Sequence, residues 1–286
     1  MRSGFTALVG RPNAGKSTLL NRILGHKISI VSDKPQTTRT RIIGVLHRPD
    51  VQVVFVDTPG IHKPVTALGE RLNESAAAAF DTDVVCLVVD ATAPLGRGDR
   101  FVADLLPLDR LIVVVTKVDL VGPEVLARQL SAAGELGASA YHPVSGLTGE
   151  GVDDLVADIV QRMGEGPPWF EDGVLSDVPE AFRVAELVRE QLLARVREEL
   201  PHSIATRVTE WDWPYIRCEI LVERESQKGM VIGKGGQLLR EVGSAVRRQL
   251  REGAYLELRV KVMKDWQRRR AVVDRLLEPD PELGQL

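Results

Sequence analysis

Short apolar runs alternate with helix-like stretches along the first half of the chain. The apolar runs occupy residues 5–9, 53–56 and 111–115, and each is followed by glycine or polar residues. Runs of this length that are rich in valine and isoleucine are typical of strands buried on both faces. Residues 19–24 favour a helix, and residues 152–160 space their apolar positions as an amphipathic helix does. The alternation predicts an α/β domain with helices on both faces of a sheet.

A change in composition separates this half from the rest of the chain. Residues 164–179 carry prolines and glycines among acidic residues and show no periodicity, which is typical of a linker. Trp169 and Phe170 favour a linker that docks on a surface. The expected divisions are a first domain over 1–164, a linker over 165–180, a second domain over 181–277 and a disordered acidic tail over 278–286.

The second half has a different order of predicted helices and strands, which indicates an α+β domain. Apolar spacing favours helices over residues 182–200, 237–250 and 266–277, the last of them basic. Alternating residues favour strands over 204–208, 216–222 and 254–262. The expected order is therefore helix, strand, strand, helix, strand, helix.

A glycine-rich loop joins the first predicted strand to the first predicted helix. It matches G-x-x-x-x-G-K-[ST], a loop whose backbone N–H groups and following helix cradle a polyphosphate. Lys16 would reach the β- and γ-phosphates, and the Ser17 hydroxyl would bind Mg²⁺. The alternative is a turn that binds nothing, and the strand–loop–helix context argues against it. The loop residues are Gly10, Arg11, Pro12, Asn13, Ala14, Gly15, Lys16, Ser17 and Thr18.

Two more polar motifs follow apolar strands further along the chain. A carboxylate at the first strand end can hold Mg²⁺ through water, and a glycine N–H there can contact a γ-phosphate. At the second strand end, an Asp can accept two hydrogen bonds from guanine, whereas adenine would leave it poorly paired. Each motif alone could be a strand end with a solvated Asp, but the ordered series predicts a GTP site. The motifs are Asp57, Thr58, Pro59 and Gly60, then Thr116, Lys117, Val118 and Asp119.

On these motifs the first half resembles the translation-factor-type small GTPases. The resemblance implies a P-loop GTPase with a mixed, mostly parallel six-stranded sheet, which binds GTP and GDP with Mg²⁺. Residues 36–39 resemble the first switch segment of that family. Thr38, with Thr37 as the second choice, would then complete a metal site with Ser17 and Asp57. Lys16, Thr38 and Gly60 are the candidate catalytic residues.

Residues 143–147 resemble the loop with which these GTPases contact guanine. They add Ser145, Gly146 and Leu147 to the candidate nucleotide site, with Gly146 where the family has alanine. Thr116 also departs from the family, whose base-recognition motif begins with asparagine. A hydroxyl offers fewer hydrogen-bonding groups than an amide. We therefore expect Asp119 to keep guanine specificity and nucleotide affinity to be lower than with asparagine.

Ile61 stands where Ras-like enzymes carry a glutamine that orients the attacking water. We count Ile61 among the nucleotide-contacting candidates, but its side chain can neither donate nor accept a hydrogen bond. Either another group positions the water, or hydrolysis is slow until a partner completes the site. Arg39 and Arg41 are near in sequence, yet neither is identifiable as an arginine finger. We expect slow basal turnover that a macromolecular target stimulates.

A second glycine-rich turn, within residues 229–236, leads into the predicted helix over 237–250. Without Cβ atoms, a nucleic-acid backbone could approach closely, and Lys234 could contact a phosphate. A tight turn without a ligand is the alternative. Within its order of elements the turn resembles that of a type II KH domain, an RNA-binding module. Candidate RNA contacts are Gly229, Val231, Ile232, Gly233, Lys234, Gly235, Gly236 and Gln237.

Some of these residues have a structural alternative. Val231, Ile232 and Leu238 could receive unstacked bases or belong to the core, and for Ile232 we favour the core. The arginines at 268–270 could contact phosphates, although a solvated helix face is the preferred interpretation. The two halves differ in net charge. Residues 181–275 hold 20 basic and 14 acidic side chains, whereas the rest of the chain holds 17 basic and 26 acidic side chains. This division fits a polyanionic partner and also fits a solvated basic surface.

The two cysteines and the overall hydropathy indicate the cellular compartment. Cys86 and Cys218 lie in separate apolar segments, which favours buried, reduced thiols in a cytoplasmic protein. The sequence shows no signal peptide pattern and no apolar run of membrane-spanning length.

With both resemblances taken together, the chain resembles ribosome-assembly GTPases in which a G domain precedes a KH domain. They imply a switch that binds the 3′ end of small-subunit ribosomal RNA and assists maturation of the small ribosomal subunit. They also imply a cytoplasmic protein that associates peripherally with the cell membrane, and we expect a monomer. One alternative is a GTPase whose second domain binds protein or membrane. The other is an RNA-binding protein that holds GTP structurally.

Overall fold

The computed structural model describes residues 1–61, 66–77, 81–197, 200–278 and 283. These described residues divide into two compact units. The first draws on Met1–Val31, Thr38–Lys63 and Leu72–Asp177, and the second on Ser32–Thr37, Pro64–Arg71 and Val178–Leu286. The expected domain, linker and tail boundaries stay predictions. Residues 279–282 and 284–286 of the expected tail lie outside the described residues.

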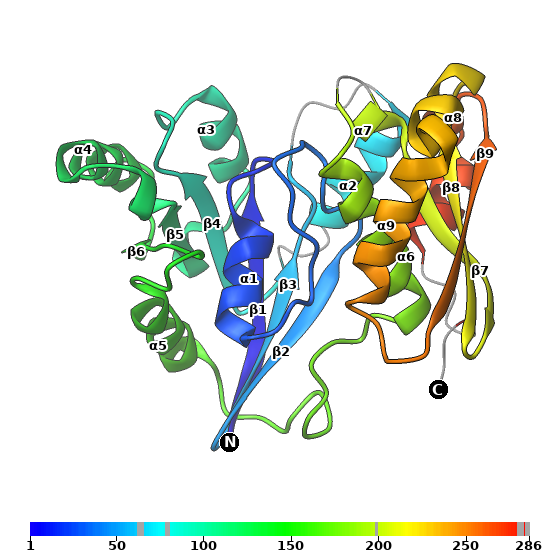
Figure 1. The fold of residues 1–286 in the computed structure, drawn as a ribbon. Coiled ribbons are helices and arrows are strands. Elements are labelled where there is room, and N and C mark those ends of the chain that lie inside the picture. The colour runs from blue at the N-terminus through cyan, green and yellow to red at the C-terminus, as the bar shows by residue number, and fades with distance from the viewer. Residues whose placement is uncertain (62–65, 78–80, 198–199, 279–282, 284–286) are drawn as a thin grey trace. The chain divides into compact units, whose positions relative to one another are not determined.

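A six-stranded sheet forms the centre of the first unit (Figure 1). Its strand order is β2-β3-β1-β4-β5-β6, in which β2 runs antiparallel to β3 and the other pairs are parallel. This confirms the mixed, mostly parallel sheet. The strands are β1 (Arg2–Gly10), β2 (Ile42–Arg48), β3 (Val51–Asp57), β4 (Val84–Asp90), β5 (Leu111–Thr116) and β6 (Ala140–Pro143).

Helices cover both faces of this sheet. On one face, Val9 and Leu87 share a core with Val102 of α3 and Ala133 of α4. Cys86, which precedes Leu87 and therefore points to the other face, lies near α5, and α5 packs against α1. Of α2, the residues from Leu72 onward belong to this unit. The helices are α1 (Lys16–Leu24), α2 (Ala67–Ala77), α3 (Arg97–Ala103), α4 (Pro123–Gly134) and α5 (Val152–Arg162).

The expected docking of the linker aromatic residues is confirmed by contacts with β1 and β3. The backbone N–H groups of Trp169 and Phe170 donate to the Gln52 side-chain oxygen, at 2.6 and 3.0 Å. The Gln52 amide nitrogen donates in turn to the Phe170 carbonyl oxygen at 2.8 Å. The Trp169 ring lies edge-on to Phe5, with 5.0 Å between ring centroids. One glutamine therefore anchors the start of this segment to the first unit.

The same segment continues along β2, the outermost strand on that side of the sheet. The Val45 N–H donates to the Leu175 carbonyl oxygen at 2.9 Å, and the Ser176 hydroxyl donates to the Ile43 carbonyl oxygen at 2.6 Å. Residues 174–176 therefore bond to backbone groups of β2 that no other strand of the described sheet uses.

The second unit has a three-stranded sheet with helices packed against it (Figure 1). β7 (Ala205–Asp212) pairs antiparallel with β8 (Tyr215–Val222), and β8 pairs parallel with β9 (Tyr255–Val262). This arrangement confirms the α+β class and the KH-like fold, although the helices over 200–203 and 225–232 were not expected from the sequence. The helices are α6 (Glu180–Leu193), α7 (Leu200–Ser203), α8 (Glu225–Ile232), α9 (Gln237–Arg247) and α10 (Arg270–Leu277).

Three helices of the second unit are shorter than expected, among them α9, which ends at Arg247 and not at residue 250. We expected the first helix to run to residue 200, but α6 ends at Leu193. Val196 lies in a turn beyond the helix and still packs into the core, so its spacing mimicked one more helical turn. The expected helix over 266–277 is a single 3₁₀ turn, Trp266–Arg268, followed by α10.

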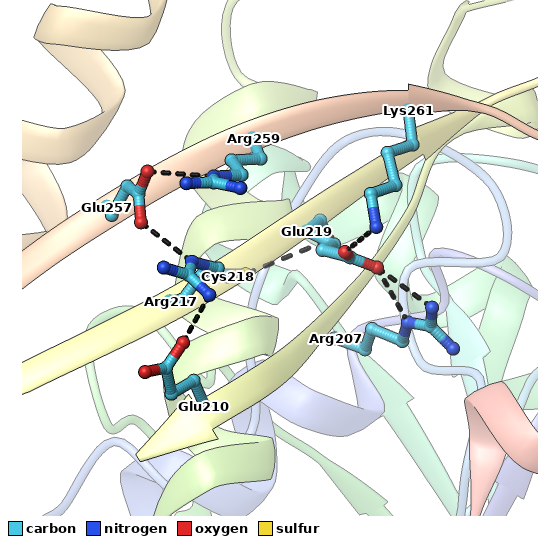
Figure 2. Close-up of polar contacts among 8 residues, drawn as sticks. All are labelled: Arg207, Glu210, Arg217, Cys218, Glu219, Glu257, Arg259 and Lys261. Atoms are coloured by element: carbon cyan, nitrogen blue, oxygen red, sulfur yellow. Dashed lines mark hydrogen bonds and ion pairs between the residues drawn. The ribbon is translucent and has the colours of Figure 1, made fainter. Parts of the chain in front are cut away.

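Charged side chains pair across all three strands of this sheet (Figure 2). Glu219 on β8, only 5% exposed, accepts hydrogen bonds from Arg207 on β7 at 2.8 Å and pairs with Lys261 on β9. Nearer the other end, Arg217 bridges Glu210 and Glu257, the latter at 2.7 Å. Cross-strand ion pairs of this kind favour one strand register over others.

Candidate functional site

The carboxyl ends of the parallel strands bring the predicted nucleotide motifs to one edge of the first sheet. β1 ends at Gly10, β3 at Asp57 and β5 at Thr116. A Cβ atom on Gly10 would lie 2.3 Å from the Val88 carbonyl oxygen, so glycine is required for the loop to leave the sheet here. The loop then turns into α1, whose first residue is Lys16.

Lys16 folds back over the loop that precedes it. Its Nζ atom lies 3.2 Å from the Gly10 carbonyl oxygen and 2.9 Å from the Arg11 carbonyl oxygen. Burial lowers the pKa of Lys16 to about 8, although the charge of Asp57 opposes that shift. A buried ammonium group whose partners are neutral carbonyl oxygens is well suited to a polyanion, because a phosphate would stabilise its charge more strongly.

Three oxygen-bearing side chains meet behind this loop. The Ser17 hydroxyl donates to Asp57 Oδ2 at 2.7 Å and lies 2.9 Å from the Thr38 hydroxyl. Asp57 is fully buried, and its Oδ1 atom has no hydrogen-bond partner among the described residues. Burial raises the pKa of Asp57, opposed by Lys16 and by the surrounding hydroxyls. The Thr37 hydroxyl instead donates to the Lys34 carbonyl oxygen at 2.6 Å, so Thr38 and not Thr37 faces this cluster.

The residues after Asp57 are fixed to the phosphate loop. Thr58 donates through its hydroxyl to the Leu8 carbonyl oxygen at 2.8 Å, and the Ile61 N–H donates to the Gly10 carbonyl oxygen at 3.1 Å. A Cβ atom on Gly60 would lie 2.4 Å from the Pro12 backbone nitrogen. The Ile61 side chain is 5% exposed and packs into the core. It therefore lies in the core and does not face an open site.

The third motif is tied to the phosphate loop by its first residue. The Thr116 hydroxyl lies 2.6 Å from the Ala14 carbonyl oxygen and 3.0 Å from that of Val89. Lys117 has a left-handed backbone, with φ of 61°, and its ammonium group pairs with Asp90. Asp119 is exposed and thus open to a ligand. Asp90 was not among the sequence candidates, although it too ends an apolar strand at this edge.

The loop at 145–147 lies beside the same motif. The Val118 N–H donates to the Val144 carbonyl oxygen at 3.4 Å, and Ser145, fully buried, accepts at its hydroxyl from the Thr148 N–H at 3.0 Å. Arg22 of α1, another residue that sequence reasoning missed, donates to the carbonyl oxygens of Gly146, at 3.1 Å, and Leu147. The candidate nucleotide site is thus assembled from several strand ends and one helix.

In the second unit, the glycine-rich turn projects into solvent. Gly233, Gly235 and Gly236 have positive φ angles of 74°, 58° and 74°, which favour glycine. Lys234 and Gly235 are exposed. The turn follows α8, which contains Gly229, and precedes α9, which begins at Gln237.

Of the three apolar candidates beside this turn, Leu238 is partly buried against the core, and the other two exchange their expected roles. Val231 is fully buried in the core of the second unit, so its side chain cannot receive a base as we had allowed. Ile232, which we had favoured for the core, is only partly buried. Arg268, Arg269 and Arg270 are exposed, and Arg270 pairs with Asp274 at 3.4 Å.

Two further observations bear on the wider chemistry. Cys86 and Cys218 are buried free thiols, and burial raises the pKa of each to about 12, which suppresses thiolate reactivity. Among the described residues, no helix combines the length and apolar character needed to span a bilayer.

Family models match both halves of the chain. A model described as a 50S ribosome-binding GTPase matches residues 5–117, and a KH domain model matches residues 199–267. The protein named GTPase Era of Mycolicibacterium smegmatis is 45% identical over 285 residues, which cover 93% of this chain and 95% of that protein. GTPase Era of Mycobacterium tuberculosis is 46% identical with the same coverage.

Solved structures match over nearly the whole chain. A crystal structure of Era in complex with MgGDPNP and nucleotides 1506–1542 of 16S ribosomal RNA superposes with a TM-score of 0.92. It is 38% identical and covers 97% of this chain and 98% of that one. A variant of Aquifex aeolicus Era bound to GDP·AlF4⁻ gives a TM-score of 0.91 at 37% identity, covering 97% and 99%.

Proposed function

Because the chain belongs to the Era family of GTPases, we propose that it is a GTP-driven switch that binds small-subunit ribosomal RNA and assists assembly of that subunit. The observation that carries the proposal is the cluster of Ser17, Thr38 and Asp57 behind a buried Lys16. An ammonium group for phosphate and a set of hard oxygen atoms for Mg²⁺ are the parts that nucleotide hydrolysis requires.

In the proposed nucleotide complex, the phosphates take the place of the carbonyl oxygens that Lys16 contacts. Backbone N–H groups of residues 13–18 face the α- and β-phosphates, and Gly60 N–H contacts the γ-phosphate. Asp119 pairs with guanine, while Ser145, Gly146 and Leu147 line the base. The remaining members of the nucleotide site named from the sequence are Arg11, Pro12, Thr58, Pro59, Lys117 and Val118. Of these, Arg11, Thr58, Lys117 and Val118 hold these groups in place through the contacts described above.

The metal site is proposed to use Ser17 and Thr38 directly and Asp57 through water. Hydroxyl and carboxylate oxygens suit Mg²⁺, which retains several of its waters when bound. The Oδ1 atom of Asp57 has no partner among the described residues, which supports this assignment because a buried carboxylate oxygen is costly unless it accepts hydrogen bonds. Bound Mg²⁺ would supply neutralisation of phosphate charge and orientation of the γ-phosphate.

Hydrolysis is proposed to be slow until the RNA or ribosomal partner is bound. Ile61 packs in the core and offers no hydrogen-bonding group to the attacking water. Lys16, Thr38 and Gly60 then contact the γ-phosphate or its metal ion. A group other than Ile61 must orient the attacking water. The ordering of the segment around Thr38 by γ-phosphate would make nucleotide state and RNA affinity reciprocal.

The second unit is proposed to hold single-stranded RNA at the turn around Lys234. Gly233, Gly235 and Gly236 admit the RNA backbone, Lys234 contacts phosphate, and the N-terminus of α9 at Gln237 adds backbone donors. Ile232 replaces Val231 as the apolar surface available for a base. By family resemblance the RNA is the 3′ end of small-subunit ribosomal RNA.

The test is hydrolysis of GTP and of ATP, each with and without that RNA. We expect GTP to be preferred, basal turnover to fall below the roughly 1–100 per second of kinases, and RNA to raise it. Lys234→Asp with Gly235→Asp should abolish the stimulation and flatten the salt dependence of RNA binding by about 0.7 per lost phosphate contact. Lys264→Asp, at another exposed lysine of the second unit, is the matched control.

Equal use of ATP, or RNA binding without dependence on salt or on Lys234, would overturn the proposal. GTP hydrolysis without salt-dependent RNA binding would favour a second unit that binds a protein or a membrane. An unchanged rate in Lys16→Ala would favour GTP held structurally. Peripheral membrane association and a monomeric state remain proposals, which vesicle co-sedimentation and light scattering would test.

A further inference from the structure

A serine outside the motifs contacts the carboxylate of the proposed metal site. The Ser29 hydroxyl donates to Asp57 Oδ2 at 2.9 Å, on the same oxygen that accepts from Ser17 at 2.7 Å. Ser29 is 3% exposed and Asp57 is fully buried, so water does not compete for this hydrogen bond. Two hydroxyls therefore engage one carboxylate oxygen, and Oδ1 is left without a partner among the described residues.

Ser29 is itself held in place by a single side chain of α1. Asn21 accepts at Oδ1 from the N–H groups of Ile28, at 2.9 Å, and Ser29, at 3.0 Å. The Asn21 amide nitrogen donates to the Ser29 carbonyl oxygen at 2.7 Å. Both backbone groups of Ser29 are thus occupied by Asn21, and its hydroxyl is directed to Asp57.

One helix therefore sets both hydroxyls on the carboxylate. Ser17 and Asn21 are four residues apart on α1 and so lie on the same face of that helix. Ser17 reaches Asp57 directly, and Asn21 reaches it through Ser29. The two hydroxyls differ in their proposed roles. Ser17 is a proposed ligand of Mg²⁺, whereas Ser29 only contacts Asp57.

We propose that Ser29, held by Asn21, is a positioning residue that orients Asp57 for water-mediated binding of Mg²⁺. This proposal rests on the proposed nucleotide site. A hydroxyl donor on Oδ2 would stabilise the ionised carboxylate and restrict its rotation, so that Oδ1 would remain available to a water held by Mg²⁺. Residues that hold a metal-binding group in this way commonly affect metal affinity by about 10–100-fold.

The test separates metal binding from nucleotide binding. Fluorescent GDP is titrated into Ser29→Ala and the unaltered protein, first in EDTA and then across a Mg²⁺ series. Because Ser29 is not among the proposed nucleotide contacts, we expect GDP affinity in EDTA to change by less than about twofold and the Mg²⁺ concentration at the binding midpoint to rise by about tenfold. Ser3→Ala is the matched control, because Ser3 is 8% exposed and donates its hydroxyl at 2.8 Å to the Pro167 carbonyl oxygen.

A double substitution tests whether Asn21 acts through Ser29. Asn21→Ala should raise the Mg²⁺ midpoint in the unaltered background and add little in the Ser29→Ala background, since both changes remove one interaction. An unchanged midpoint in Ser29→Ala, or an equal loss of GDP affinity in EDTA and in Mg²⁺, overturns the proposal. Failure of the proposed nucleotide site itself would be seen separately, as an unaltered protein that does not bind GDP.

Discussion

The hydroxyl of Thr116 lies 2.6 Å from the backbone carbonyl oxygen of Ala14, which joins the end of β5 to the phosphate loop. A Cβ atom on the neighbouring Gly15 would meet this hydroxyl at 3.3 Å, so the two segments are in close contact. The short threonine side chain thus makes a tether between the end of β5 and the phosphate loop. What asparagine would add is the contact with the base.

Substitutions at Thr116 should separate the tether from the base contact. Thr116→Val keeps the shape and removes the hydrogen bond, so GDP should bind about 2–10-fold more weakly, as for a lost hydrogen bond of about 0.5–1.5 kcal/mol. Thr116→Asn should tighten both GDP and GTP, because the amide can reach the guanine. Titration calorimetry measures both variants. No tightening with asparagine would contradict the lower affinity that we assign to Thr116.

Gly60→Ala should impair hydrolysis more than GDP binding. The added Cβ would lie 2.4 Å from the Pro12 backbone nitrogen, so the segment that carries the proposed γ-phosphate contact must shift. A misplacement of about 1 Å can cost about 10²-fold in rate. Single-turnover hydrolysis measures the effect. Gly164→Ala is the control, because a Cβ atom there would meet no atom within 4 Å; equal rates in the two variants would refute the prediction.

Asp90→Asn should accelerate GDP release. Asp90 pairs with Lys117, and hydrogen bonds from Thr92 hold its other oxygen at 2.6 and 2.8 Å. Without the charge on Asp90, Lys117 loses the partner that fixes it beside the base motif. We expect a dissociation rate about 2–10-fold higher, on the scale of one hydrogen bond. Stopped-flow displacement of fluorescent GDP is the measurement, with Asp104→Asn, at an exposed position, as the control.

The ion pairs of the second sheet predict an acid-dependent stability. Hydrogen bonds from Tyr215, Arg217 and Arg259 lower the pKa of Glu257 from 4.5 to about 2. A lowered folded-state pKa stabilises the fold above pH 4.5, and the stabilisation is lost as pH falls from 4.5 through 2. Glu257→Gln should therefore lower the urea midpoint by a constant amount from pH 8 to pH 5.5.

Below pH 4.5 the difference between Glu257→Gln and the unaltered protein should shrink. Tryptophan fluorescence during urea unfolding follows it, since Trp211, Trp213 and Trp266 belong to the second unit. Glu252→Gln, at an exposed glutamate, should show no such dependence. A Glu257→Gln effect that persists unchanged at pH 3 would mean that the ionised carboxylate is not its source.

Sequence patterns were sufficient to place the nucleotide motifs because they sit at strand ends. β1 pairs in parallel with β3 and β4, and β4 pairs in parallel with β5, so Gly10, Asp57 and Thr116 come to one edge without further information. Fold class followed for the same reason. The contacts of Asn21 and Ser29 could not be predicted, because they depend on how a loop folds back onto α1.

Two other failures had local causes. Val231 and Ile232 are adjacent apolar residues in the last turn of α8, and periodicity alone does not say which one faces the core. The early end of α6 was hidden because Val196 reaches the same core from a turn. In both cases tertiary packing decided between patterns that look alike in one dimension.

The attachment of residues 174–176 to β2 also covers one edge of the first sheet. An outer strand with open amide and carbonyl groups is a template on which a second molecule can polymerise. Leu175 and Ser176 occupy groups of Val45 and Ile43 that would otherwise be available to it. Residues 174–176 thus protect the edge of the sheet from pairing with another molecule. A chain that ends before residue 174 should be more prone to aggregate.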